Sequence, residues 1–142
     1  MSGPPDPLVF FTDRDLGKRF PASLSEAGLT VVRHADLFEP ACPDDEWLAK
    51  VGSEGWIAVS RDARIRYKPN EKEAVLLHGV RLLVLVGQIP LPQLAANFMA
   101  TVDKITIFVA QHPAPWIAKV YRPPSNAADG SSGSLSLWLS GV

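Results

Sequence analysis

The sequence has little cysteine, little net charge and no long apolar run, and each shortage excludes a class of protein. Its single cysteine, Cys42, cannot form an internal disulfide, so we expect a protein of the reducing cytoplasm. No stretch approaches the ~20 apolar residues of a membrane span, and the first residues lack the basic region of a signal peptide. The formal net charge of -1 is unlike that of dedicated nucleic-acid modules, which are usually strongly basic. Any contact with nucleic acid must therefore come from a local patch.

Length and composition predict one domain with two flanking segments. A chain of 142 residues, 46% of them hydrophobic, is long enough to bury roughly two-thirds of its surface on folding. Three prolines and a glycine within residues 1–7 predict a flexible lead-in. From residue 123 the composition shifts to Pro, Ser, Gly and Ala, which predicts disorder or a linker at 123–133. We therefore expect a domain at 8–122 and a tail at 123–142.

The apolar pattern predicts strands that alternate with helices. Short apolar runs predict strands at 8–11, 29–32, 56–60 and 81–86, and helical spacing covers 16–27, a stretch from 44, and 71–77. Residues 94–109 have the spacing of one helix, or of two joined near Thr101, and 116–121 could form a last strand, at an edge. This order predicts an α/β fold, with a parallel sheet covered by helices on both faces.

Three alternating leucines near the end of the chain, Leu135, Leu137 and Leu139, have the spacing of one more strand. They could extend a sheet edge of this chain or of a neighbouring molecule. They could equally be foreign to the natural protein, and the sequence leaves the three alternatives open.

Acidic side chains stand where a parallel α/β sheet forms its sites. Asp13 and Asp62 each follow an apolar strand, and Asp44, Asp45 and Glu46 stand at a helix start. Such residues can converge on one crevice at the carboxyl ends of the strands. Clustered carboxylates repel one another unless a cation neutralises them, and oxygen-only ligands favour Mg²⁺ or Mn²⁺ over zinc. A site of this kind can activate water for hydrolysis of a phosphodiester.

A basic stretch follows the third predicted strand. Its four cations are Arg61, Arg64, Arg66 and Lys68. Beside a metal site they could hold a polyanionic backbone, and Tyr67 among them could stack on an unpaired base. Ser60, just before them, could offer a hydroxyl to the metal or its water.

Each of these features also has a plainer interpretation. An aspartate after a strand most often caps a turn or helix, and acids in a first helical turn are favoured by the helix dipole. A run of basic residues is usually a solvated surface. His34, His78 and His112 have no metal-binding or catalytic spacing. The acids therefore indicate a site only as a group.

Three segments together resemble the PIN-like domain family, in the branch related to VapC-type toxins of bacterial toxin–antitoxin pairs. The segments are FFTDRDLGKRFPASLSEAGLTVVRH at 10–34, CPDDEWLAKVGSEGWIAVSRDARI at 42–65, and PNEKEA at 69–74 ahead of VRLLVLVG. The resemblance extends over about residues 8–122. It implies a PIN-like three-layer α/β/α sandwich with a central, mainly parallel sheet.

The resemblance also implies an activity and its residues. It implies an Mg²⁺-dependent endoribonuclease, with Mn²⁺ as a substitute, whose substrate RNA is held by the basic stretch. Asp13, Asp44 and Asp62 would bind the metal with help from Glu46 or Asp45, and Asp15 and Glu71 are further candidate acids. A cognate antitoxin would block the pocket, within a homodimer or a toxin–antitoxin hetero-oligomer. Many family members carry another acid after the fourth strand, but residues 87–90 here are Gly-Gln-Ile-Pro, which favours one tightly held ion.

Two rival hypotheses stay open. Asp13 and Asp15 are also similar to the DxD nucleophile pair of haloacid-dehalogenase-type phosphatases, although the acidic pair which that chemistry needs after a later strand comes too early here. Alternatively, a PIN-like protein with little catalysis could act by binding RNA or a protein partner.

Overall fold

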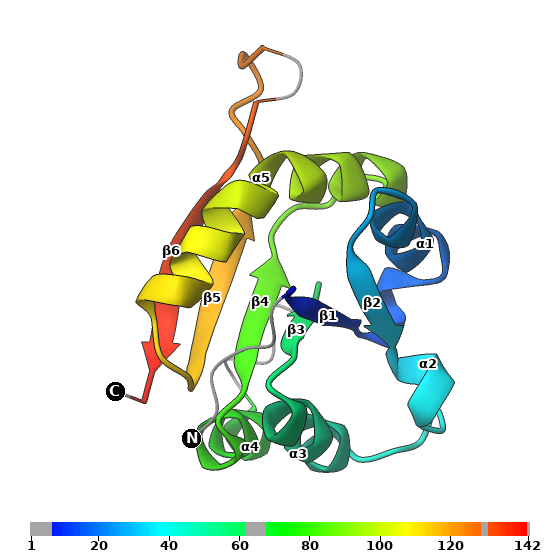
Figure 1. Ribbon diagram of the computed structural model, residues 1–142, viewed down its shortest axis with the longest axis vertical. Coiled ribbons are helices and arrows are strands. Elements are labelled where there is room, and N and C mark those ends of the chain that lie inside the picture. Colours follow the sequence, from blue (N-terminus) through cyan, green and yellow to red (C-terminus); the bar gives the residue numbers. More distant parts are fainter. Residues whose placement is uncertain (1–6, 62–67, 129–130, 142) are drawn as a thin grey trace.

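A six-stranded sheet forms the centre of the computed structural model, which describes residues 7–61, 68–128 and 131–141 (Figure 1). The strand order is β2-β1-β3-β4-β5-β6. Neighbouring strands from β2 to β5 are parallel, and β6 is antiparallel to β5. The strands are β1 (Val9–Thr12), β2 (Thr30–Arg33), β3 (Ile57–Ser60), β4 (Arg81–Leu85), β5 (Trp116–Tyr121) and β6 (Ser134–Ser140).

Helices cover both faces of this sheet, which confirms the predicted three-layer α/β/α sandwich. The helices are η1 (Arg14–Leu16, a 3₁₀ turn), α1 (Arg19–Glu26), α2 (His34–Leu37), α3 (Asp44–Glu54), α4 (Pro69–His78) and α5 (Leu91–Gln111). In Figure 1, α5 lies above the sheet, and α3 and α4 lie below it. No helix in the described ranges is both long enough and apolar enough to cross a membrane.

The two core clusters follow from the alternation of side chains along the strands. Phe10 packs on the face covered by α1 and α5, beside Phe20 and Phe98. The next residue, Phe11, points to the opposite face and packs with Trp47 of α3. The short apolar strands are therefore buried on both faces, as expected for a parallel sheet.

Three local features differ from the expected pattern. The helix expected at 16–27 is broken because Gly17 takes a positive φ of 68° between η1 and α1. The short helix α2 was not predicted; the Asp36 carboxylate caps its start by accepting from the Arg33 N–H at 3.4 Å. The span 94–109 lies within a single helix, in which the Thr101 hydroxyl donates to the Asn97 carbonyl at 2.7 Å and so causes no break.

The alternating leucines of the predicted tail belong to β6, which pairs with β5 along its whole length. The edge position expected for β5 is therefore wrong, since β6 is the outer strand. Leu135 packs against one core cluster, and Trp138 and Leu139 pack against the other. Part of the segment placed outside the domain by composition thus completes the sheet, because its apolar side chains cover both faces beside β5.

Candidate functional site

Two acids meet at the carboxyl ends of β1 and β3, which are neighbouring parallel strands. The backbone N–H of Asp13 donates to the Val59 carbonyl at 3.0 Å, so the turn after β1 is tied to β3. The Asp13 carboxylate then caps η1 by accepting from the Arg14 N–H at 2.7 Å. This local structure places Asp15, inside η1, beside the end of β3.

Ser60 links the two carboxylates. Its hydroxyl lies 3.0 Å from Asp15 Oδ2 and 3.3 Å from Asp13 Oδ2, and Asp15 Oδ2 also accepts from the Arg61 N–H at 3.0 Å. A hydroxyl has one proton to donate, so it can serve one of these oxygens at a time. We call Asp13, Asp15, Ser60 and Arg61 the strand-end cluster.

Arg61 is anchored rather than free. Its Nη2 donates to the carbonyls of Gly87 and Ile89 at 3.1 and 3.0 Å. These carbonyls belong to the loop after β4, whose residues 87–90 include no acid. In this chain a guanidinium therefore holds that loop against the strand-end cluster.

A second group of acids lies where α3 and α4 begin, and we call Asp44, Asp45 and Glu71 the helix-end cluster. They line a cavity of about 430 Å³. Asp44 accepts from Trp47 Nε1 at 2.9 Å. Burial, together with a hydrogen bond that the protonated Glu71 donates to Asp44 and repulsion by the Asp44 carboxylate, raises the pKa of Glu71, and Lys68 Nζ at 4.0 Å only partly opposes this. Two carboxyl groups so placed share a proton or attract a cation.

Glu46 is turned away from this cavity. Its Oε2 accepts from Cys42 Sγ at 3.1 Å. Burial and the Glu46 carboxylate raise the pKa of the Cys42 thiol to about 11. The thiol is therefore protonated at neutral pH, and it is a poor nucleophile in that form.

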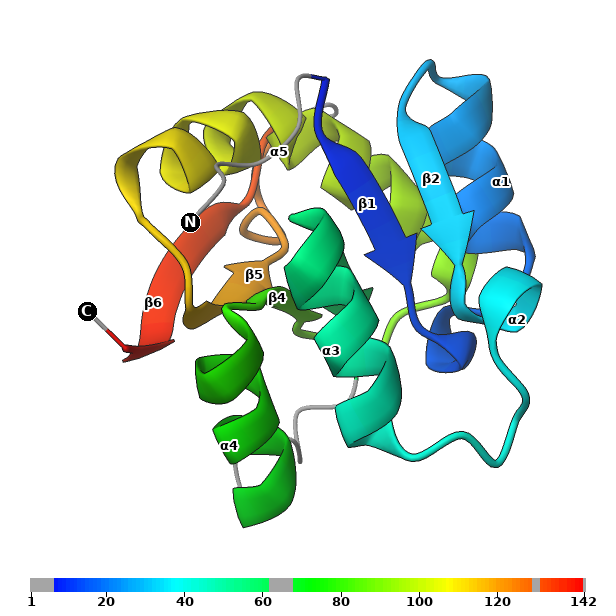
Figure 2. The ribbon, with the colours of Figure 1, turned by 60° about the horizontal axis from the view of Figure 1, so that its bottom comes forward.

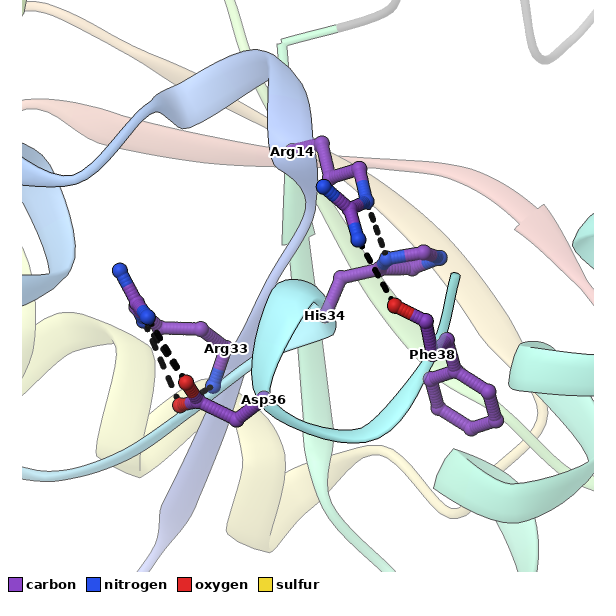
Figure 3. A network of polar contacts seen from close by, with 5 residues as sticks. All are labelled: Arg14, Arg33, His34, Asp36 and Phe38. Atoms are coloured by element: carbon purple, nitrogen blue, oxygen red, sulfur yellow. Dashed lines mark hydrogen bonds and ion pairs between the residues drawn. The ribbon is translucent and has the colours of Figure 1, made fainter. Parts of the chain in front are cut away.

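His34 connects the two clusters electrostatically. Arg14 donates from Nε to His34 Nδ1 at 2.9 Å and from Nη2 to the Phe38 carbonyl at 2.7 Å (Figure 3). Burial and the charge of Arg14 lower the pKa of His34, and the carboxylate of Asp44 opposes them. The His34 ring thus interacts electrostatically with Arg14, the residue that follows Asp13 in the strand-end cluster, and with Asp44 of the helix-end cluster.

Both clusters lie at one edge of the molecule. In Figure 2, β1 and β2 point toward the lower side of the view, and α3 and α4 begin on that side. The structure thus brings Asp13 together with Asp15, and Asp44 with Asp45 and Glu71. Asp62, Arg64, Arg66 and Tyr67 lie outside the described residues.

The donors at this edge are chemically suited to magnesium. They are carboxylates and a hydroxyl, the hard oxygen ligands that Mg²⁺ and Mn²⁺ prefer. Among residues 7–61, 68–128 and 131–141, no three acidic, histidine or cysteine side chains form a complete metal site. A complete ligand set would therefore need a residue beyond those ranges or a rearrangement of the two clusters.

Sequence reasoning did not single out Arg14, Lys18, Arg33 or His34 as site residues. His34 directly follows β2, whose carboxyl end lies beside that of β1. The strand-end rule that identified Asp13 applies equally to His34. His34 was not chosen because no possible metal-binding partner stands at a regular spacing from it in the sequence.

Comparison with known proteins agrees with this architecture. The family model described as PIN like domain matches residues 8–87. The chain is 33% identical over 117 residues to "Putative ribonuclease VapC45" of Mycobacterium tuberculosis, an alignment that covers 78% of this chain and 84% of that protein. No solved structure matches significantly. The family match and this relative together show that the chain is a VapC-type member of the PIN-like domain family.

Proposed function

We propose that this protein is a metal-dependent endoribonuclease that acts as the toxin of a toxin–antitoxin pair. The observation that carries the proposal is that the pair Asp13 and Asp15 and the pair Asp44 and Glu71 lie on the same side of the molecule, toward which β1 and β2 point. The name of the related VapC45 protein supports RNA as the substrate.

Asp13, Asp44 and Asp62 would hold the Mg²⁺, for which Mn²⁺ could substitute. Asp15, Asp45 and Glu71 are further candidate ligands, and Glu46 would have to leave Cys42 to join them. A bound divalent cation supplies charge neutralisation at the phosphodiester and a more acidic water. Burial first and Asp44 second disfavour the negative charge of Glu71 and so raise its pKa, and a bound cation would offset this cost.

The protein's own groups would position the substrate and move the proton. Ser60 and the Arg61 N–H hold the carboxylate of Asp15 in place. If Glu71 is not itself a metal ligand, its carboxylate would accept the proton of the attacking water, since a raised pKa makes a carboxylate a stronger base. Arg64, Arg66 and Lys68 would hold the RNA backbone, and Arg61 would assist only with N–H groups not bound to the loop after β4.

The proposed toxin role requires a protein partner. A cognate antitoxin would cover the acidic edge, either by placing cationic side chains on it or by separating the two clusters. A homodimer or a toxin–antitoxin hetero-oligomer is the expected assembly. Co-expression with the antitoxin should then suppress cleavage by the wild-type chain.

The test is cleavage of a mixed pool of structured RNAs with Mg²⁺, with Mn²⁺ and with a chelator. We expect metal-dependent cutting at defined positions by the wild type, and its loss in Asp13→Asn and Asp62→Asn. Asp103→Asn is the matched control, because Asp103 is an exposed acid on α5. Undiminished cutting by Asp13→Asn would refute the assignment. RNA binding without turnover under any metal would instead favour the rival hypothesis of a binding protein.

A further inference from the structure

A smaller cavity of about 200 Å³ adjoins the strand-end cluster on the side of β2. Its wall includes Thr12 and Asp13 at the end of β1, Arg14 and Lys18 around η1, and Arg33 and His34 at the end of β2. We call this space the β1–β2 cavity, because it lies at the carboxyl ends of these two adjacent parallel strands. Asp13 lies on its wall, so whatever occupies the cavity is a neighbour of the proposed catalytic acids.

Cations outnumber anions in the lining. Arg33 is neutralised by Asp36, whose Oδ1 lies 2.7 Å from Arg33 Nη2 (Figure 3). Arg14 is held by neutral acceptors, the His34 ring and the Phe38 carbonyl, so it keeps an uncompensated charge. Lys18 is exposed, and its side chain has no hydrogen bond or ion pair to any residue in the described ranges. Two positive charges are thus available against the one carboxylate of Asp13.

The floor of the cavity contains a polar atom that needs a partner. Thr12 is only 1% exposed. Its Oγ1 is buried and has no hydrogen-bond partner within the described part of the chain. An unsatisfied buried hydroxyl costs about 1–3 kcal/mol. Thr12 lines the cavity, but its Oγ1 is not reached by solvent in this structure, so the hydroxyl gains a partner only when the cavity wall adjusts around a ligand.

We propose that the β1–β2 cavity binds a backbone phosphate of the RNA, at a linkage next to the one that is cut. The inference rests on the proposed ribonuclease function and extends it to the β2 side of Asp13, whereas Arg61 follows β3 on the other side of β1. A phosphodiester has the negative charge that Arg14 and Lys18 favour, and its oxygens can accept from their N–H groups. A phosphate held there would fix which linkage of the RNA lies beside the acidic clusters.

Binding of a single-stranded RNA oligonucleotide, measured by fluorescence anisotropy in chelator over a range of KCl concentrations, tests this site without cleavage. Lys18→Gln should weaken binding several-fold at low salt and reduce the slope of log Kd against log salt by about 0.7, the value for one phosphate contact in a single strand. Arg19→Gln is the control, because it removes the same charge one residue away, outside the cavity lining. It should keep the wild-type slope.

A second arm places a neutral methylphosphonate at each linkage in turn. At the linkage seated in the cavity, this change should weaken binding to the wild type but add little to the effect of Lys18→Gln. Equal slopes for Lys18→Gln and the wild type would overturn the phosphate site while leaving the nuclease intact. Failure of the wild type to bind or cut RNA would overturn both proposals. Uptake of inorganic phosphate, with RNA affinity unchanged in Lys18→Gln, would show a site for free anions and refute the assignment to RNA.

Discussion

Replacing Glu71 by glutamine should stabilise the metal-free protein at neutral pH. Two effects favour the ionised form of Glu71, namely its place in the first turn of α4 and Lys68 at 4.0 Å. Burial and Asp44 oppose them, and the raised pKa shows that the opposing effects prevail. Glutamine keeps the size and the hydrogen-bonding capacity of the side chain while it removes the unfavourable charge.

The size of the effect follows from the link between proton affinity and stability. A tenfold difference in proton affinity between folded and unfolded states corresponds to about 1.4 kcal/mol. The Glu71 side chain is only 16% exposed, so solvent screens it weakly, and we expect a gain on the order of 1 kcal/mol, or a rise of about 4 °C in Tm. Because the folded pKa lies above the unfolded value, the wild type loses this stability as the pH rises from about 4.5 through the folded pKa.

Urea unfolding in chelator at pH 4 and pH 8 measures this prediction. Glu71→Gln should exceed the wild type at pH 8, and the difference should shrink at pH 4. Glu73→Gln is the matched control, because Glu73 is an exposed acid on the same helix and beside the same cavity. A Glu71→Gln variant that is equal to or less stable than the wild type at pH 8 would refute the inferred crowding with Asp44.

Three further changes have defined outcomes. Arg61→Ala should lower the free energy of unfolding by about 2 kcal/mol, because it removes two bonds from a charged donor to the Gly87 and Ile89 carbonyls; urea titration measures it, and an unchanged midpoint would contradict the anchoring role. The buried His34 has a lowered pKa, so stability should fall as the pH drops below about 6.5, by up to about 1.4 kcal/mol per pH unit. In His34→Gln that decline should disappear, and a parallel pH profile would disprove the assignment to His34. A chain ending at Gly133 lacks β6 and leaves the β5 edge unpaired, so size-exclusion chromatography should show self-association where the full chain does not; a monomeric, equally stable truncation would contradict it.

The sheet was largely predictable because its strands are short, apolar and buried on both faces. Phe10 and Phe11 illustrate this, since these adjacent apolar side chains are buried in the two core clusters on opposite faces of the sheet. The alternating leucines of β6 indicated a strand, but the sequence left open whether it joins this sheet, because that depends on pairing with β5. Tertiary pairing of this kind leaves little trace in a local pattern.

The strand-end part of the site followed from one topological rule, but the helix-end part did not. Asp13 was identifiable because it comes directly after a buried strand. The approach of Glu71 to Asp44 depends on how α3 packs against α4, which needs the small Gly52: a Cβ there would lie 2.0 Å from the His78 carbonyl oxygen. A spacing of 27 residues between Asp44 and Glu71 contains no information about that contact. The hydrogen bonds from Arg14 to His34 and to the Phe38 carbonyl could not be predicted either, because they too depend on tertiary packing.

Whether the two acidic clusters form one metal site is best tested by titrating Mn²⁺ into the wild type, Asp13→Asn and Asp44→Asn and measuring its affinity by calorimetry. One shared site predicts that each substitution weakens the same high-affinity binding event by at least about tenfold, and that the double variant is little worse than either single one. If instead each substitution removes a separate event and leaves the other intact, the clusters bind metal independently and the account of a single catalytic edge is contradicted.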